Sequence, residues 1–361
     1  MRKTIIISVI LTFGFSLTAT AQGCIAIRNL PAGFGQFASL GYSQTSDKWM
    51  LDISNRYFEA ASGFSGSTNK GYDGVNIYQF ITNFSLTRLL DKGWALSLDM
   101  PIQYGTTATP TANSGIRQSQ HAFGLGDMRL TVYKWILSTD VFRRGNIQFG
   151  LGIKFPTGNY RAVDYYYNSD NPAVKTLAPV NTVIQLGDGG TGITTQLNAY
   201  YIFSPSISVF GDFFYLISPV NTSGVAAWPP GLFPPAQDSL NIETTENVNS
   251  VPDNYTLNVG ANIIFHRFVF TGGLKYQGAP AHDLFGENDG RRVPGHIFSV
   301  EPGAQFKFKR SILYFTVSIP VERGAIPSVP DERAAAITGV PTQGGGHFAD
   351  VLYYFGYTFT F

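Results

Sequence analysis

The chain has 361 residues, enough for one large domain, and only 14% of them are Asp, Glu, Lys or Arg. An ordinary soluble domain carries about 25%. Aromatic residues make up another 14%, glycine contributes 39 residues, and the formal net charge is +1. Such a chain lacks the basic surface of nucleic-acid-binding proteins, so no nucleic-acid partner is expected. The composition favours a protein solvated partly by lipid, and a soluble secreted β-sandwich is the alternative.

The N-terminus has the three parts of a secretory signal peptide. Arg2 and Lys3 supply positive charge, residues 5–17 are mostly apolar, and Ala19-Thr20-Ala21 supplies small residues for cleavage. This pattern predicts a signal peptide at residues 1–21. The apolar run is shorter than the roughly 20 residues of a membrane-spanning helix, and no later run is long enough. Any membrane span must therefore consist of strands closed into a barrel.

Residues 22–47 lie between the signal peptide and the first expected strand, and two interpretations of them stay open. The segment contains Gly, Phe and Ala and could fold into a barrel lumen as a plug, or it could be a periplasmic segment outside the barrel. It includes Cys24, the single cysteine of the chain, which cannot form an internal disulfide. The barrel itself is expected to comprise residues 48–361.

Apolar and polar residues alternate with a period of two along most of the remaining chain, which is the pattern of β-strands. The runs are about 10 to 14 residues long, the length of a tilted transmembrane strand. They are 48–60, 75–89, 93–105, 123–137, 145–157, 191–203, 206–218, 254–266, 268–278, 295–309, 311–323 and 348–361.

The connections between these runs alternate in length. Those after every second run are short, whereas the others include residues 161–190 and 221–253. A β-sandwich has no reason to sort its loops in this way. The sequence thus predicts an all-β fold: a transmembrane antiparallel up-and-down β-barrel of about twelve strands, with short periplasmic turns and long extracellular loops. Fourteen strands would result if residues 33–47 paired with a further strand.

The last run alternates aromatic residues from Tyr353 to Phe361. A terminal aromatic strand that ends in Phe resembles the signal that the barrel-insertion machinery reads. Left unpaired, it would be an aggregation-prone edge, and pairing with the first strand removes that edge. We therefore expect the outer-membrane lipid and the insertion machinery as partners, and the cell outer membrane as the location.

The inward face of the expected strands is polar and carries charges of both signs. Mixed charges in a lumen are expected to form ion pairs that stiffen the barrel. The sharper hypothesis is a constriction built from Arg56, Asp99, Asp127 and Arg129, because twelve strands leave a narrow interior. The full set of candidate constriction or solute-contact residues is Arg56, Asp99, Asp127, Arg129, Lys154 and Asp212.

No catalytic, cofactor-binding or metal site is expected. The five histidines include no His-x-x-x-His pair, and no G-x-S-x-G motif is present. His282 beside Asp283 is the one acid–base candidate, near the expected outer rim. An outer-membrane hydrolase is therefore the weakest alternative.

Three short glycine-containing segments carry a resemblance to a known family. They are Gly124-Leu125-Gly126-Asp127, Lys154-Phe155-Pro156-Thr157-Gly158 and Leu186-Gly187-Asp188-Gly189-Gly190-Thr191-Gly192. In this order they resemble the outer-membrane family named after the MetA-like protein of phenol-degradation pathways, which is distantly similar to the fatty-acid and aromatic-hydrocarbon channels. The resemblance implies a transporter barrel. The hydrocarbon channels have an Asn-Pro-Ala motif in an N-terminal plug, and here Asn29-Leu30-Pro31-Ala32 departs from it by one inserted residue.

These observations leave two leading hypotheses. The first is an outer-membrane channel for passive uptake of small, hydrophobic or amphipathic solutes. The second is a closed barrel with a structural or surface-binding role. A continuous path through the lumen favours the first, and a lumen filled with paired charges favours the second.

Overall fold

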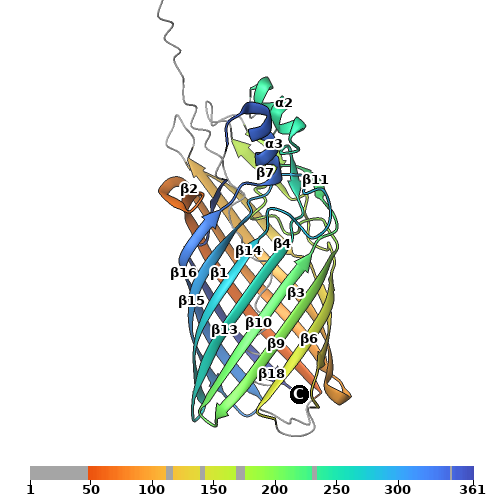
Figure 1. Ribbon diagram of the computed structural model, residues 1–361, viewed down its shortest axis with the longest axis vertical. Helices are drawn as coiled ribbons and strands as arrows, with labels where there is room; N and C mark the ends of the chain where they lie inside the picture. The colour runs from red at the N-terminus through yellow and green to blue at the C-terminus, as the bar shows by residue number, and fades with distance from the viewer. Residues whose placement is uncertain (1–47, 111–116, 139–142, 168–174, 230–233, 342–343) are drawn as a thin grey trace, which may run out of the picture.

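The computed structural model describes residues 48–110, 117–138, 143–167, 175–229, 234–341 and 344–361. The expected signal peptide and the segment 22–47 lie outside the described residues. The described chain forms a closed antiparallel barrel of twelve strands with loops gathered at one end (Figure 1). This confirms the predicted fold class and strand number. Within the described residues, no helix is long and apolar enough to cross a membrane.

Eleven positions in the barrel wall are single strands and one is a strand in two parts, β4 and β5. In wall order they are β1 (Trp49–Ser65), β2 (Thr68–Leu89), β3 (Trp94–Pro110), β4 (Arg117–Leu125) with β5 (Arg129–Trp135), β6 (Gly145–Lys154), β9 (Gly192–Ser204), β10 (Ile207–Ile217), β13 (Asn254–Phe265), β14 (Phe268–Ala279), β15 (Gly295–Lys307), β16 (Ser311–Ala325) and β18 (Val351–Thr360).

The barrel is closed by its first and last strands. β1 pairs with β18 from Met50–Thr360 to Glu59–Val351, and the Phe361 N–H donates to the Trp49 carbonyl over 2.9 Å. The aromatic C-terminal strand is thus paired on both sides, by β1 and β16, and leaves no free edge.

Alternation along each strand separates a lipid-facing side from a lumen side. In β6, Ile147, Phe149 and Leu151 are 42 to 51% exposed, whereas the intervening Gln148 is buried. A transmembrane strand presents apolar residues to lipid on its outer face, and the residues between them face the lumen.

The loops follow the predicted length rule, with one difference. Short turns join the strands at the end where the C-terminus lies, such as η1 (Asp91–Gly93) and the turn at His266, whose φ is 56°. At the other end, β1 with β2, and β3 with β4, continue beyond the neighbouring strands as long hairpins. Parts of the predicted loops are therefore extended strand, because cross-strand pairing satisfies their backbone groups.

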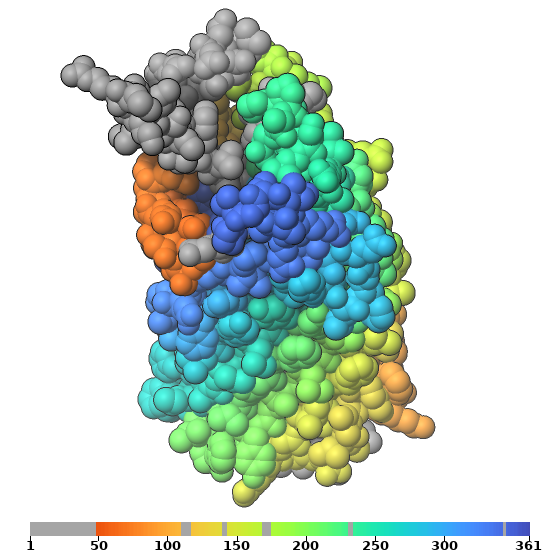
Figure 2. All heavy atoms as spheres, turned by 45° about the horizontal axis from the view of Figure 1, so that its top comes forward, coloured from red at the N-terminus to blue at the C-terminus, as the bar shows by residue number. Residues whose placement is uncertain are grey.

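The remaining elements form a cap at the loop end. They are β7 (Val163–Tyr167), β8 (Lys175–Pro179), β11 (Thr222–Ala226), α2 (Pro235–Glu243), β12 (Val248–Ser250), α3 (Val329–Thr338) and β17 (Gly345–His347). Figure 2, tilted toward this end, shows α2 and α3 side by side above the barrel wall. A capping box of Ser328 and Asp331 begins α3, and Gly339 with φ 73° ends it.

Candidate functional site in the barrel lumen

The three glycine-containing segments noted in the sequence meet at one place in the barrel wall, which we call the motif junction. Its centre is Asp127, in the gap between β4 and β5. One carboxylate oxygen accepts the Gly158 N–H at 3.0 Å, and the other accepts the Asp188 N–H at 3.2 Å. Residues that are distant in sequence are thereby joined by a single side chain. The prediction that Asp127 lies within a continuous strand is wrong, because these hydrogen bonds hold it in an interruption of the strand.

The junction has further polar contacts on both sides of Asp127. The Thr157 hydroxyl accepts the Met128 N–H and donates to the Gly126 carbonyl, each over 2.8 Å. The Lys154 ammonium forms an ion pair with Asp188 and lies 3.6 Å from Asp127. The three charged side chains are only 4 to 13% exposed, which strengthens their interaction relative to a surface pair.

A segment of the loop between β8 and β9 leaves the junction and enters the lumen. We call residues 180–188 the strap. Its backbone turns on itself, since the Ile184 N–H donates to Asn181 O over 2.9 Å. Lumen-facing amides hold it: Gln79 donates to Val183 O over 3.1 Å, and Gln103 donates to Leu186 O. The expectation that residues 161–190 form an outer loop is thus correct for β7 and β8 and wrong for the strap.

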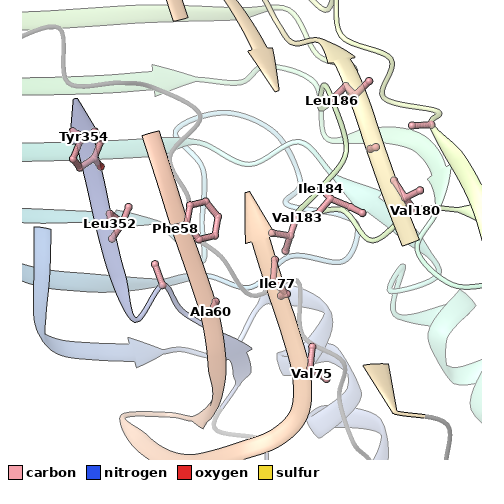
Figure 3. Close-up of a cluster of buried hydrophobic side chains, with 13 residues drawn as sticks. Phe58, Ala60, Val75, Ile77, Val180, Val183, Ile184, Leu186, Leu352 and Tyr354 are labelled. Atoms are coloured by element: carbon pink, nitrogen blue, oxygen red, sulfur yellow. The ribbon is translucent and has the colours of Figure 1, made fainter. Parts of the chain in front are cut away.

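Apolar side chains of the strap pack against the lumen face of β1, β2 and β18. Figure 3 shows Val183 beside Ile77 and near Phe58, whereas the Ile184 side chain points away from these two residues. Ile184 lies against Gly105 of β3 and belongs to the same buried cluster. These side chains and Leu352 are buried together, with Val183, the most exposed of them, at 8%. We call the wall side of this contact, formed by Phe58, Ala60, Ile77 and Leu352, the apolar patch.

Two glycines permit the close approach of strap and wall. A Cβ at Gly105 of β3 would lie 2.7 Å from the Ile184 Cβ, and one at Gly158 would lie 2.3 Å from the Leu186 carbonyl oxygen. Both separations are shorter than any allowed contact, so a larger residue at either site would push the strap away.

Below the end of the strap lies a small polar cavity of about 40 Å³. A cavity of this size holds about three water molecules. Its lining combines charged, amide and apolar residues: Ile81, Asn83, Asp99, Pro101, Gln103, Asp127, Arg129, Lys154, Asp188, Leu216 and Asn254.

An ion pair between neighbouring strands forms one wall of the cavity. Arg129 donates through Nη2 and Nε to one oxygen of Asp99, over 2.8 and 3.0 Å. The two residues are directly opposite in the β3–β5 register. The guanidinium also lies 5.4 Å from the centre of the Phe214 ring, a cation–π distance.

Four of the six residues predicted for a constriction line this cavity: Asp99, Asp127, Arg129 and Lys154. Arg56 is not among the lining residues. It donates to Gln79 over 3.2 Å and thus orients the amide that holds the strap. Asp212 lies elsewhere on β10, opposite Asn198 and Asn258 in register. A second buried pair, Lys275 with Glu301 at 2.9 Å, belongs to this other side of the lumen.

Sequence reasoning missed the strap and the residues that hold it. Gln79, Gln103 and Asp188 make contacts of the strap or the junction, and none was a candidate site residue. A usable signal was present in the sequence: the apolar residues Val180, Val183, Ile184 and Leu186 are concentrated within seven residues of the predicted loop. Such spacing indicates a segment that packs against something.

The one acid–base candidate is not assembled for catalysis. Asp283 forms an ion pair with Arg292 at 2.7 Å and accepts the Asp253 N–H at 2.9 Å. His282 instead lies 3.8 Å from Glu332 on the surface. In the part of the chain that the structure describes, no group of three or more metal-ligating side chains is found.

The cap contains a charged contact between two loops. Glu246 lies 3.7 Å from Arg291, whose guanidinium stacks 3.8 Å from the centre of the Trp228 ring. Burial raises the pKa of Glu246 to about 7, although Arg291 opposes this shift and Asp331 adds to it. Burial likewise lowers the pKa of Arg291 to about 10.

The closed barrel, its lipid-facing exterior and its polar lumen define an outer-membrane-type β-barrel. Of the solved structures that resemble it, an outer membrane channel from Pseudomonas putida F1 has a TM-score of 0.57 at 11% identity, over 88% of this chain and 97% of that one. This likeness shows a shared fold.

Two further barrels are more distant. The TodX monoaromatic hydrocarbon channel has a TM-score of 0.43 at 9% identity, over 90% of this chain and 92% of that one. The β-domain of the Bordetella autotransporter BrkA also has a TM-score of 0.43, at 8% identity, over 87% and 100%. Neither bears on function. No protein-family model matches the chain, and no curated protein matches its sequence.

Proposed function

We propose that the protein is an outer-membrane channel that admits small hydrophobic or amphipathic solutes by passive diffusion. The observation that carries this proposal is the strap. A barrel of eight strands is just narrow enough for its own side chains to fill, and twelve strands leave additional room. Here that room contains a loop segment held by side-chain amides, the Asp127 carboxylate and the Lys154–Asp188 ion pair, and no β-ladder joins it to the described wall.

The chemistry of the lumen supports an amphipathic solute class. The strap faces the apolar patch on one side, and its lower end borders the cavity lined by Asp99, Arg129 and Lys154. A solute that passes both regions binds more favourably if it has an apolar body and a polar end. The apolar body suits the patch, because an unpaired polar group is costly to bury there, and the polar end suits the charged cavity.

The second candidate, a closed structural barrel, is favoured by a specific observation. The pairs Asp99–Arg129 and Lys275–Glu301 span neighbouring strands and are almost fully buried. Buried pairs of this kind stiffen the barrel wall without any role in transport.

The location and family of the protein form part of the proposal. The expected signal peptide and the paired aromatic strand β18 support export and insertion into the outer membrane by the insertion machinery. The three segments that resemble the MetA-like family meet at the motif junction, which supports membership of that family. We propose no enzymatic activity.

Single-channel recording of the refolded protein in a planar bilayer tests the proposal. Discrete conductance steps are expected, together with faster accumulation of radiolabelled toluene by porin-deficient Gram-negative cells that express the protein. A silent bilayer and toluene uptake no faster than in cells without the protein would refute the channel. The closed structural barrel would then be the better explanation.

A further inference from the structure

The apolar patch is unusual for its position. Phe58, Ala60, Ile77 and Leu352 lie on the lumen face of three adjacent strands, with Phe58 opposite Leu352 and Ala60 opposite Ile77 in register. Elsewhere the described lumen face is mainly polar, with buried residues such as Ser97, Thr131 and Gln196. Without a cover, the patch would face the interior of the barrel.

The cover that the structure provides is part of the chain itself. The hydrogen bonds that hold the strap to the described barrel wall are made by the side chains of Gln79, Gln103, Gln120, Asp127 and Lys154. No β-ladder joins the strap to the described wall. Water can replace such contacts without breaking a strand pairing of the wall, and the charged contacts of Asp127 and Lys154 are the costliest to replace.

We propose that the apolar patch is a binding subsite for a small apolar or monoaromatic solute, and that the strap, through Val183, covers this subsite until the solute takes its place. This inference rests on the proposed channel function. Apolar cavities lined by aliphatic and aromatic residues bind benzene. Phe58 supplies a ring face or edge for an aromatic solute.

Matched substitutions on the two sides of this contact separate a solute subsite from a simple packing surface. Ile184→Thr changes the strap, and Ile77→Thr changes the wall. Both residues belong to the buried cluster that packs the strap against the wall, so both variants are expected to raise ion conductance tenfold or more. Toluene uptake by expressing cells is expected to rise with Ile184→Thr and to fall at least threefold with Ile77→Thr, because the solute has lost part of its subsite.

A second pair of variants leaves the patch chemistry intact. Gly105→Val places a side chain where the Ile184 Cβ lies 2.7 Å away and should displace the strap. Gly272→Val is the control, since a Cβ there meets nothing within 4 Å. Conductance and toluene uptake are expected to rise together in Gly105→Val and to stay unchanged in Gly272→Val.

The outcomes are distinguishable from failure of the proposed function. If the native protein transports toluene and Ile77→Thr raises uptake as much as Ile184→Thr does, the patch only packs the strap and the inference is overturned. An unchanged Gly105→Val would also overturn it, because the strap would then not limit entry. Absence of conductance and uptake in the native protein and every variant would instead reject the channel itself.

Discussion

Removing the Asp127 carboxylate should release the strap while leaving the barrel closed. In an Asp127→Ala variant, the Gly158 and Asp188 N–H groups lose their acceptor, and Lys154 keeps Asp188 as its partner. The wall strands β3, β5 and β6 retain their own pairing, since none of their ladder hydrogen bonds involves this side chain.

The size of the effect follows from the two lost hydrogen bonds. Each joins a backbone N–H to a charged acceptor, an interaction that contributes about 1.5–3 kcal/mol. The Asp127 side chain is 4% exposed, so solvent screening is small. Allowing for water that enters to hydrate the freed groups, we expect docking of the strap to weaken by about 3 kcal/mol. That corresponds to a roughly 100-fold increase in the open population.

Hydrogen–deuterium exchange read by mass spectrometry measures this population directly. When closing is faster than exchange, the rate in a peptide covering residues 180–188 follows the open fraction. We expect a roughly 100-fold acceleration in Asp127→Ala and a smaller one in Asp127→Asn, which retains a single acceptor oxygen. Asp331→Ala is the control, because Asp331 accepts the Ser328 N–H over 2.9 Å in the capping box of α3, and none of its described contacts involves the strap. Strap exchange within twofold of the native rate in Asp127→Ala would refute the reasoning.

Three further changes probe the rest of the molecule. Arg129→Met leaves Asp99 buried without its cation, so we expect the free energy of unfolding in urea to fall by about 3 kcal/mol; an unchanged midpoint would contradict this. Since burial raises the pKa of Glu246 to about 7 from 4.5, docking of its loop should be firmest below pH 4.5 and weaken as pH rises through 7. The protection factors of residues 245–250, in which the intrinsic pH dependence of amide exchange is divided out, should fall over that range, and Glu246→Gln should flatten their pH profile. Deleting residues 22–47 should increase single-channel conductance if they plug the lumen, whereas equal conductance would favour a periplasmic segment.

The barrel was predictable because its determinants are local. A strand with lipid on one side and a polar lumen on the other must alternate its side chains, so Ile147, Phe149 and Leu151 identify an outer face from the sequence alone. The pairing of the aromatic last strand with β1 follows from the cost of an open edge.

The sequence predicted which charged residues face the lumen, but it did not predict which of them form ion pairs. Alternation assigns Asp99 and Arg129 to the inside, but their pairing depends on the register between β3 and β5. The same limit applies to Arg56, whose side chain supports Gln79 and does not line the cavity with the other candidates.

The position of the strap inside the lumen was decided by tertiary structure. Asp127 binds the backbone 61 residues further along the chain, and Gln79 binds the strap 104 residues away. A local pattern carries no information about such separations, and it places Asp127 in a regular strand. The sequence by itself determined the barrel, because lipid and lumen impose a period of two on every strand. What fills the lumen was decided only by the tertiary structure, because it depends on which polar groups distant in sequence form hydrogen bonds in the closed barrel.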